Sequence, residues 1–489
     1  MRQYLILAAI ALPILGGIGI PLLPFRRRGQ MLAYIEALVI ATSVIVWTLL
    51  PGGTTETFHL VHFVNDLSIS FKIDGMTMVF AGLIAVLWPL ATLYAFEYMQ
   101  HEAHEKSFFL FYTMTYGVTL GIAFASDMLS MYFFYELLTL VTVPLVMHTL
   151  TREAILAVRN YLYVSIGGAA FALMGMIFLM VYGDTCEFTL GGVFSADTLS
   201  RHGILLRWIY LFSFMGFGVK AAVFPLSGWL PQAGVAPTPV TALLHAVAVV
   251  NAGAFAIIRL TYYSFGTEFL SGSWVQNVCL GLTMFTIIYG CSRAAKESHI
   301  KRRLAWSTVS NLSYILFGAV VMTSQGLVGA LSHFVFHGFM KITSFLCAGA
   351  FMHQTGKAYV YEMDGMGKRM KLVFGAFTVS ALGLMGVPGL AGFISKWNLT
   401  EAAVSSGHPL AYLGVACLML SALLTAIYML SIVRRAFFPA AEAEITASVT
   451  DPGWQMCLPL VLCAAATVLL GLFSAPLIDF FRAVALGTL

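Results

Sequence analysis

The fold of this chain is decided by the stretch Tyr210-Leu-Phe-Ser-Phe-Met-Gly-Phe-Gly-Val-Lys-Ala-Ala-Val-Phe-Pro-Leu-Ser-Gly-Trp229. It starts as an apolar run and then carries Lys220, followed five residues later by Pro225. An apolar run of about 20 residues crosses a hydrocarbon core about 30 Å thick as a helix. A charge beside a helix-breaking proline is tolerated at that depth only where it faces protein or water. We therefore expect a broken transmembrane helix with a functional lysine.

The composition of the whole chain agrees with a membrane location. Of its 489 residues, 60% are hydrophobic and 10% are charged, against roughly 45–50% and 25% in soluble domains. These values exclude a water-soluble globular protein and a disordered one. A net charge of only +4 also argues against nucleic-acid binding. The sequence predicts an all-α polytopic membrane protein.

The cysteines do not indicate a cofactor. They occur singly, without the spacing of zinc, haem or iron–sulfur ligands. We therefore expect no cofactor in this chain, so that any redox centre belongs to a partner subunit. The seven are Cys186, Cys279, Cys291, Cys347, Cys417, Cys457 and Cys463.

Apolar runs predict about fourteen transmembrane helices in one transmembrane domain, residues 1–489. The first run lacks the basic start and cleavage site of a signal peptide, so we expect it to be a helix. The connections around 51–75, 183–204 and 434–454 are too short and irregular for a soluble domain. The alternative is that two weak spans are merged or split. The expected helices are 3–24, 30–50, 76–98, 107–125, 128–149, 160–182, 205–226, 237–262, 275–292, 304–322, 326–353, 371–398, 409–433 and 455–484.

The basic residues predict the orientation, because Lys and Arg concentrate in cytoplasmic loops. Of the 26 basic residues, 17 fall in loops after odd-numbered helices and six on the other side. This separation predicts a multi-pass protein of the cell inner (plasma) membrane with both termini outside. The six are Arg2, Lys72, Arg201, Arg207, Arg259 and Arg482.

Three lysines and one glutamate within expected spans need an explanation, because a charge at the centre of a helix costs roughly 2.5–3.5 kcal/mol on insertion scales. Glu136 has no basic residue on its own helix, so its partner must lie on another helix. Lys220 could snorkel, although Pro225 and Gly228 interrupt its helix first. Lys341 is more than ten residues from either end of its span. For Lys396 snorkelling is a serious alternative, because it comes late in its span.

Histidines accompany these charges. His333, His337 and Lys341 are spaced i, i+4, i+8 and so share one helix face. This row is either a polar packing stripe or, as we favour, a proton relay, because imidazole accepts a proton on one nitrogen and releases one from the other. Metal binding is disfavoured, because no nearby carboxylate or cysteine completes a site. His245 alone would be a core histidine, but between Lys220 and Lys341 it is a plausible bridge.

Two expected helices are interrupted beside a lysine. One break contains Pro225 after Lys220, and the other contains Pro388, in Val387-Pro-Gly-Leu-Ala-Gly-Phe393, before Lys396. They are five spans apart, and an odd offset reverses direction in the membrane, as in an inverted repeat. The expected repeats comprise helices 4–8 (107–262) and 9–13 (275–433), flanked by helices 1–3 (1–98) and helix 14 (455–484).

Several motifs resemble one known family. The segment Gly218-Val-Lys-Ala-Ala-Val-Phe-Pro-Leu-Ser-Gly-Trp-Leu-Pro-Gln-Ala-Gly-Val-Ala-Pro-Thr-Pro-Val-Thr-Ala-Leu-Leu-His245 is similar to the signature of the antiporter-like subunits of respiratory complex I. Mrp-type cation/proton antiporters and membrane-bound nickel–iron hydrogenases share these subunits. The resemblance runs from about 70 to 435. Further matches are Phe133-Phe-Tyr-Glu-Leu-Leu138, Ile300-Lys-Arg-Arg-Leu-Ala-Trp-Ser-Thr-Val-Ser310, His333 to Lys341, and Gly392-Phe-Ile-Ser-Lys396.

The resemblance implies fourteen helices, inverted repeats and broken helices 7 and 12. It also implies proton movement along a central axis. Glu136 and Lys220 would form an interacting pair and His245 would continue the axis. His333, His337 and Lys341 would form its middle, and Lys396 the terminal exchange site.

The chain departs from the family pattern at three places. Gln232 stands where an acidic residue is common, so a proton-loading group near that mouth is in doubt. The eighth span has no lysine, only His245 and Asn251, which makes histidine the bridge. Lys396 replaces a glutamate of some relatives and favours the Mrp-like and hydrogenase-like branches.

These observations favour a proton-translocating subunit of a redox-driven complex, related to a hydrogenase or to complex I. Expected partners are other antiporter-like and small membrane subunits, a redox module, H⁺ and possibly Na⁺, and the lipid bilayer. The alternatives are a subunit of an Mrp-type Na⁺/H⁺ antiporter and a membrane scaffold with inert charges. The chain carries no P-loop, so the driving force must come from a redox partner or an ion gradient.

Overall fold

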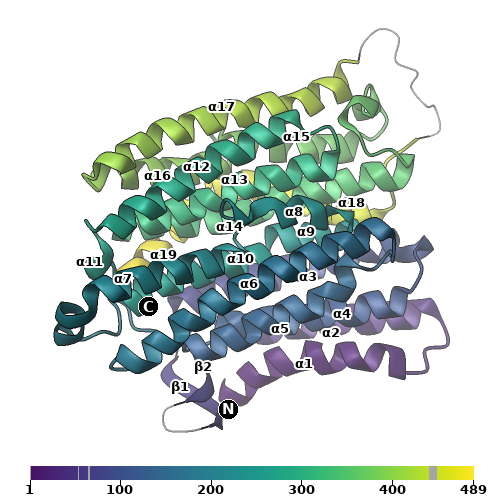
Figure 1. Cartoon of the computed structure of the whole chain (residues 1–489). Coiled ribbons are helices and arrows are strands. Elements are labelled where there is room, and N and C mark those ends of the chain that lie inside the picture. The colour runs from purple at the N-terminus through teal and green to yellow at the C-terminus, as the bar shows by residue number, and fades with distance from the viewer. Residues whose placement is uncertain (1, 53, 64–66, 440–448) are drawn as a thin grey trace.

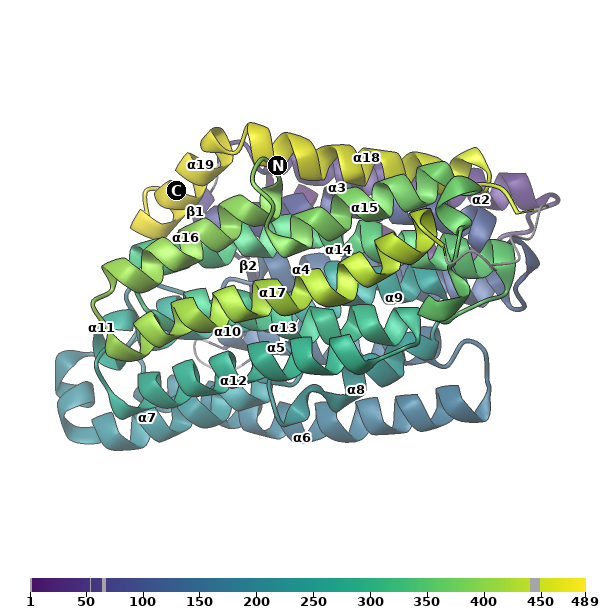
Figure 2. The ribbon, with the colours of Figure 1, turned by 90° about the horizontal axis from the view of Figure 1, so that it is seen from above.

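The computed structural model describes residues 2–52, 54–63, 67–439 and 449–489 as a bundle of long helices (Figure 1). The helices lie side by side between α1 and α17, and both chain ends lie toward the same end of the bundle. Seen from above, α6 runs along one edge and α18 along the opposite one (Figure 2). The region 105–265 comprises α4 Glu105–Phe124, α5 Met128–Val146, α6 Arg152–Tyr182, α7 Ala196–Gly218, α8 Trp229–Gln232, α9 Thr238–Ala246, α10 Val249–Ile258 and the π-helix η4 Arg259–Phe265.

The remaining helices precede and follow that region. The N-terminal group contains α1 Arg2–Leu22, α2 Arg28–Leu49 and α3 Gly75–Tyr98. After the short α11 Thr267–Leu270 come α12 Trp274–Lys296, α13 Ile300–Val320, α14 Ser324–Thr355, α15 Lys371–Met385, α16 Ala391–Ser405, α17 Pro409–Phe437, α18 Trp454–Leu472 and α19 Ala475–Leu486.

Eleven helical segments among the described residues are long and apolar enough to cross a membrane. The expected ranges 205–226, 304–322 and 371–398 are not among them. The helix at the first carries Arg201 and Arg207, and the helix at the second starts with a basic run. The third range is divided between the two 15-residue helices α15 and α16. These features shorten or dilute the apolar stretch, although each range contains helix.

The core of the bundle surrounds α14. Every residue of the most apolar window of α14 is buried, as it is in the segment Thr238–Phe265. α14 packs against α9, α13, α15, α16 and α18. Polar side chains on α14 therefore face protein on all sides, which is the environment in which a charge inside a membrane is tolerated.

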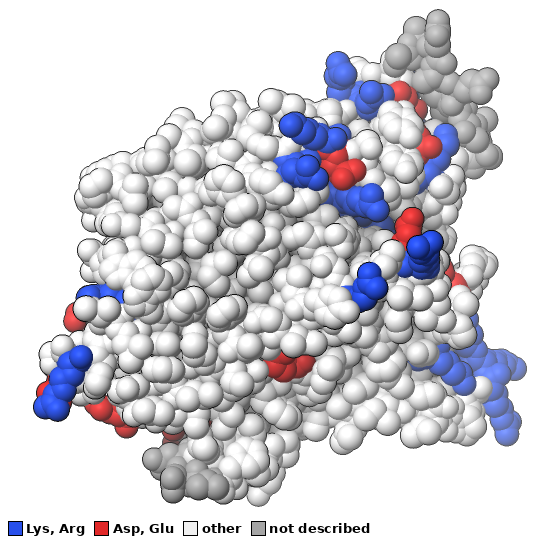
Figure 3. Space-filling model, viewed as in Figure 1, with Lys and Arg blue, Asp and Glu red and all other residues white. Residues whose placement is uncertain are grey.

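Charged side chains on the surface gather at the two ends of the bundle. On the face shown in Figure 3, Lys and Arg gather mainly at the end opposite to the chain termini, and a nearly uncharged band separates the two ends. This band matches the apolar belt of a membrane protein. The end that carries most of the basic loops is called the basic face below.

Two expected single helices are wrong, because the chain breaks within them. The range 237–262 is divided at Val247 and Ala248, and the range 455–484 at Phe473 and Ser474. The break expected at Pro388 within the range 371–398 is present at 386–390. The expected seventh helix is shifted, since α7 ends at Gly218. The helix thus ends seven residues before Pro225. The break is therefore longer than the proline alone predicts.

The connection expected to be irregular at 51–75 contains a hairpin. β1 Thr54–His62 pairs antiparallel with β2 Ser68–Ile73, and the register joins Phe58 to Phe71 and His59 to Ser70. The residues of β2 are largely buried against the bundle. Its alternating apolar and polar residues gave a strand signal that a search for apolar runs does not detect.

Candidate functional site

Lys220 lies in the non-helical segment after α7 and is 1% exposed. Its Nζ donates a hydrogen bond to the backbone oxygen of Tyr135 and lies 3.4 Å from the centre of the Tyr135 ring. The segment is held in place by Trp229, whose Nε1 donates to the Val219 oxygen at 2.8 Å. Gly253 permits the close approach of α10, since a Cβ there would lie 2.8 Å from the Lys220 carbonyl carbon. The ammonium is therefore fixed by a carbonyl dipole and a ring face.

Glu136 follows Tyr135 on α5 and is partly buried. Its Oε1 is buried and has no hydrogen-bond partner among the described residues. The charges of Glu136 and Lys220 interact through space, although no ion pair closer than 4.0 Å joins them in the described part of the chain. The sequence-predicted pair thus stands as two neighbouring groups and not as a closed salt bridge.

His245 lies in the last turn of α9, just before the break at Val247 and Ala248. Its ring stacks on Phe345 of α14 at 4.6 Å, and neither ring nitrogen has a partner among the described residues. The first turn of α10 contains Asn251, whose Nδ2 donates to the Ala246 oxygen at 3.0 Å. Both nitrogens of a fully buried imidazole thus remain open at a helix break.

The predicted row on α14 is present as a stack. The rings of His333 and His337 lie 5.7 Å apart at 25°, and His333 also stacks on Tyr314 of α13. His333 Nδ1 lies 2.9 Å from Ser395 Oγ, whereas neither nitrogen of His337 has a partner in the described ranges. Lys341 donates to Ser307 Oγ at 2.7 Å. All three row residues are 0% exposed.

Lys396 lies five residues into α16, beside the break that contains Pro388. Its Nζ donates to the oxygens of Leu384 at 2.7 Å and Met385 at 3.1 Å, which are the last carbonyls of α15. A helix C-terminus carries a partial negative charge that stabilises a cation. Gly386 continues the chain with φ 91°, a left-handed conformation that suits glycine. The break therefore holds Lys396 by its ammonium.

The two halves meet at α9 and α14. Phe345, the residue on which His245 stacks, lies one turn beyond Lys341 on α14. One turn before Lys341, Gly338 approaches the Ala246 oxygen, which a Cβ there would meet at 3.4 Å. The structure thus brings His245 next to the α14 row, with Lys220 and Lys396 at the two flanking breaks.

Sequence reasoning missed an ion pair at the end opposite the basic face. Arg259 was assigned to a loop, but it is 1% exposed in η4 and donates to both Asp74 oxygens at 2.6 and 2.7 Å. Asp74 is also the N-cap of α3 and accepts from Thr77 N at 2.9 Å. Burial raises the pKa of Asp74, but the Arg259 charge and the hydrogen bonds from Arg259 and Thr77 outweigh it and hold that pKa below its ordinary value.

Two further charges were overlooked. Glu36 lies within α2 and its Oε2 is buried without a hydrogen-bond partner among the described residues, so Glu136 is not the sole glutamate inside an expected span. Lys301, counted as a loop charge, is 5% exposed in the first turn of α13 and donates to the Ala236 oxygen at 2.8 Å. Glu36 was visible in the sequence as a charge six residues into the range 30–50. The local sequence does not predict the burial of Lys301, because the residues that bury it are in α8 and in the segment before α9.

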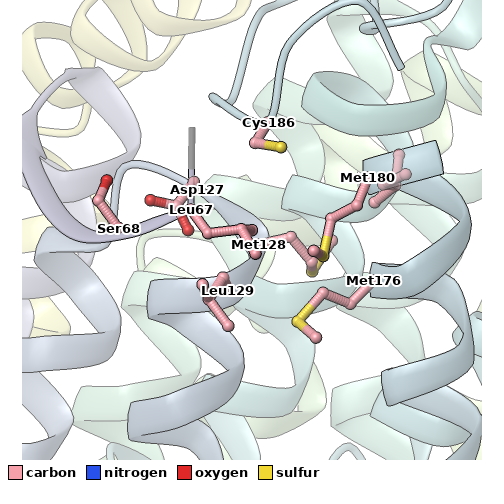
Figure 4. A pocket seen from close by; sticks show the side chains of 9 residues that line it. Leu67, Ser68, Asp127, Met128, Leu129, Met176, Met180 and Cys186 are labelled. Atoms are coloured by element: carbon pink, nitrogen blue, oxygen red, sulfur yellow. The ribbon is translucent and has the colours of Figure 1, made fainter. Parts of the chain in front are cut away.

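A carboxyl group also lies beneath the hairpin. Asp127 caps α5, is 4% exposed, and accepts from Ser130 N at 2.7 Å and from the Ser70 hydroxyl. Burial raises the pKa of Asp127, and the hydrogen bonds from Ser70 and Ser130 offset only part of this effect. A cavity of about 10 Å³ lies beside it, with Met176 and Met180 on the far side (Figure 4). This volume is about that of one water molecule.

Comparison with known proteins gives matches over most of the chain. The family model described as NADH:quinone oxidoreductase/Mrp antiporter, TM, matches residues 125–432. A second, described as NADH-Ubiquinone oxidoreductase (complex I), chain 5 N-terminus, matches residues 63–109. The chain is 29% identical to NADH-quinone oxidoreductase subunit N of Desulforudis audaxviator, over 93% of this chain and 92% of that protein.

Other similar proteins come from different assemblies. The chain is 26% identical to a probable K⁺/H⁺ antiporter subunit of Rhizobium meliloti, over 98% of this chain and 48% of that protein. Its fold resembles a chain in the membrane-bound sulfane sulfur reductase, an archaeal respiratory membrane complex, with a TM-score of 0.85 and 20% identity over 99% of this chain and 97% of that one.

Proposed function

Because the chain belongs to the NADH:quinone oxidoreductase/Mrp antiporter family of membrane subunits, we propose that it translocates protons as one subunit of a redox-driven membrane complex. Membership confirms the family that the sequence resemblance predicts. The proposed path runs through Glu136, Lys220 and His245, then through the α14 row, to Lys396.

One observation carries this path. Titratable side chains lie inside an apolar bundle, where each isolated charge is costly, and two of them, Lys220 and Lys396, lie beside broken helices. The lysines bind backbone carbonyls and a hydroxyl, and the central imidazole nitrogens of His245 and His337 are open among the described residues. Groups that only stabilised the bundle should be paired with one another, because leaving a buried polar group unsatisfied costs about 1–3 kcal/mol.

The chemistry follows from electrostatics. Desolvation lowers the proton affinity of a buried lysine, and a nearby carboxylate raises it. Tyr135 and Glu136 are adjacent on α5, so movement of α5 relative to the α7 break changes the contact of Lys220 with Tyr135 and its distance from Glu136 together. We propose that Lys220 holds its proton when Glu136 is close and releases it toward His245 when Glu136 is distant.

The middle of the path needs no permanent charge. A neutral histidine accepts a proton at one nitrogen and releases one from the other. His337 lies between His333 and Lys341 with both nitrogens open among the described residues, so it can pass a proton in either direction after a small ring rotation. Lys396 would then exchange the proton with the side opposite the basic face.

The architecture supports two finer proposals. We propose fourteen crossings with inverted repeats over 107–262 and 275–433, because each repeat has its break beside a lysine in its fourth span. We also propose that the basic face is cytoplasmic in the plasma membrane, since Lys and Arg concentrate in cytoplasmic loops. Both termini would then lie outside. Partners would be membrane subunits of the same complex, because a similar fold occurs in a respiratory membrane complex.

The test uses membrane vesicles that contain the whole complex. With the electron donor supplied, Glu136→Ala or Lys220→Ala should abolish ΔpH formation, read with a pH-sensitive dye, while electron transfer continues or slows. Unchanged pumping in both variants would falsify the path. Lys396→Ala tests the exchange site, which is excluded if H⁺ and Na⁺ transport both survive.

A second candidate is a role in a cation/proton antiporter without redox chemistry. The similarity to an antiporter protein from Rhizobium meliloti supports it. The proteins that copurify separate the two functions: iron–sulfur and quinone or hydrogenase subunits indicate the redox complex, and small antiporter subunits alone indicate the antiporter.

A further inference from the structure

A chain of hydroxyl groups leaves the axis at Lys341. The ammonium donates to Ser307 Oγ at 2.7 Å, and Ser307 Oγ lies 2.7 Å from the Tyr428 hydroxyl. The Tyr428 hydroxyl in turn donates to Thr425 Oγ1 at 3.2 Å. The four residues come from α14, α13 and α17, and each is at most 2% exposed. The chain is thus a continuous set of hydrogen bonds inside the bundle.

One residue of the hydroxyl chain, Tyr428, also lines a cavity at the basic face. This cavity has a volume of about 320 Å³, and its lining includes Arg303, Tyr361, Tyr428, Ser431 and Arg434. Tyr428 therefore belongs both to the hydroxyl chain and to the cavity wall. Arg303 fixes this wall, because its Nη1 donates to the backbone oxygen of Tyr428 at 3.1 Å and to Ser431 Oγ at 2.8 Å.

The positions along the helices agree with a route from that face. Ser307 is seven residues from the start of α13 and Tyr428 is nine residues from the end of α17. At 1.5 Å per residue, both lie roughly 10–14 Å below the helix ends of the basic face. Two hydrogen bonds therefore separate Lys341 from a residue that lines the cavity.

We propose that the hydroxyls of Tyr428 and Ser307 conduct protons between this cavity and Lys341, which gives the second half of the axis its own access to the basic face. The inference rests on the proposed function. Access through Glu136 and Lys220 would then not be the sole supply of the α14 row.

The transfer balances at every step. With Lys341 neutral, the Tyr428 hydroxyl turns from Thr425 Oγ1 to donate to Ser307 Oγ, and Ser307 donates to the Lys341 amine. A proton from the cavity then binds the Tyr428 hydroxyl oxygen while the Tyr428 hydroxyl proton passes to Ser307 Oγ. The original Ser307 proton passes to the neutral amine of Lys341, which becomes the ammonium. Each hydroxyl gains one proton and loses one, so only Lys341 changes charge. Rotation of the two hydroxyls then restores the starting hydrogen bonds.

A neighbouring cluster provides the comparison. Cys291 Sγ lies 3.0 Å from Ser421 Oγ and 3.1 Å from Ser310 Oγ, one turn along α13 from Ser307. This cluster is buried and hydrogen-bonded in the same way, yet none of these three residues lines the cavity. If the hydroxyls served only packing, loss of Ser310 or of Ser307 would have the same effect.

The experiment measures the initial rate of proton transport in vesicles with the whole complex. Tyr428→Phe and Ser307→Ala should lower it by about tenfold or more, less than the 10²–10⁴ typical of direct proton-transfer groups. The controls are Tyr116→Phe, which removes a buried hydroxyl that lies 2.8 Å from Ser43 Oγ, and Ser310→Ala. Both should retain most of the rate.

The variant Lys341→Ala distinguishes failure of the hydroxyl route from failure of the proposed function. If Lys341→Ala abolishes transport and Tyr428→Phe behaves as Tyr116→Phe does, the hydroxyl route is wrong and the proposed function stands. If Lys341→Ala transports normally, the proposed function fails, and the route fails with it.

A second measurement covers the case in which Tyr428→Phe does not assemble. Tyr361 is 56% exposed at the cavity, so Tyr361→Cys can react with a membrane-impermeant thiol reagent. Reagent applied to the basic face should slow transport relative to the same variant before labelling, and the unsubstituted protein with its own cysteines should be unaffected. Labelling without slowing overturns the proposal.

Discussion

The buried pair of Asp74 and Arg259 offers a quantitative test of the packing between α3 and η4. The change is Asp74→Asn, which keeps the side-chain shape and the N-cap of α3 but removes the negative charge. The Arg259 guanidinium then remains 1% exposed without its counter-charge. The two residues are 185 positions apart in the sequence, so they form the pair only in the folded bundle.

Removing one partner of a buried ion pair costs about 3–5 kcal/mol. The lower end applies here, because the Asp74 side chain is 17% exposed and three aromatic rings remain within about 5 Å of the guanidinium. We therefore expect a loss of about 3 kcal/mol in the free energy of unfolding at pH 7. Arg259→Met should cost about 2 kcal/mol, since it leaves a carboxylate that water can reach.

The double variant provides the control. Asp74→Asn with Arg259→Met should lose less than the two single variants together, because neither charge is then left buried and unpaired. The assay is equilibrium unfolding of the purified protein in mixed micelles with increasing sodium dodecyl sulfate, followed by circular dichroism. Additive losses would contradict direct coupling of the two side chains.

The pH dependence has a definite sign. The pKa of Asp74 is held low in the folded protein, so its stabilising effect is present above the unfolded value of about 3.9 and is lost as the pH falls further. The gap in stability between the unsubstituted protein and Asp74→Asn should therefore narrow as the pH is lowered from 7 to 3. An equal gap at both pH values refutes the reasoning.

Three other predictions follow from single contacts. Gly253→Ala should slow proton transport, because its Cβ would push on the Lys220 backbone. The control, Gly281→Ala, should leave the rate unchanged, because nothing lies within 4 Å of a Cβ there. Equal transport rates of the two variants in a vesicle assay would contradict this prediction. Ser395→Ala removes the partner of His333 Nδ1 and should lower the transport rate by severalfold, with Ser405→Ala on the same helix as control. Asp127→Asn should raise the thermal midpoint at pH 8 and have little effect at pH 4, because burial raises the pKa of Asp127 and the charged form is disfavoured in the fold; a pH-independent effect argues against this cause.

Much of the architecture followed from local sequence. Runs of apolar residues located the helices, and Pro225 and Pro388 located two breaks, because hydropathy and proline chemistry act within one segment. The spacing of His333, His337 and Lys341 predicted a row on one face for the same reason. No comparable signal marked the break at Val247 and Ala248, because residues 241–252 around it contain no proline or glycine.

By itself, then, the sequence determined that this is a membrane protein with four conspicuous charges in its spans, and it placed two of them, Lys220 and Lys396, beside helix breaks. Only the tertiary structure decided what each lysine touches. Lys220 binds a carbonyl on α5, Lys396 binds the end of α15, and Lys341 reaches a hydroxyl of α13. These partners lie on other helices, and helix packing, which no local pattern encodes, brings them together.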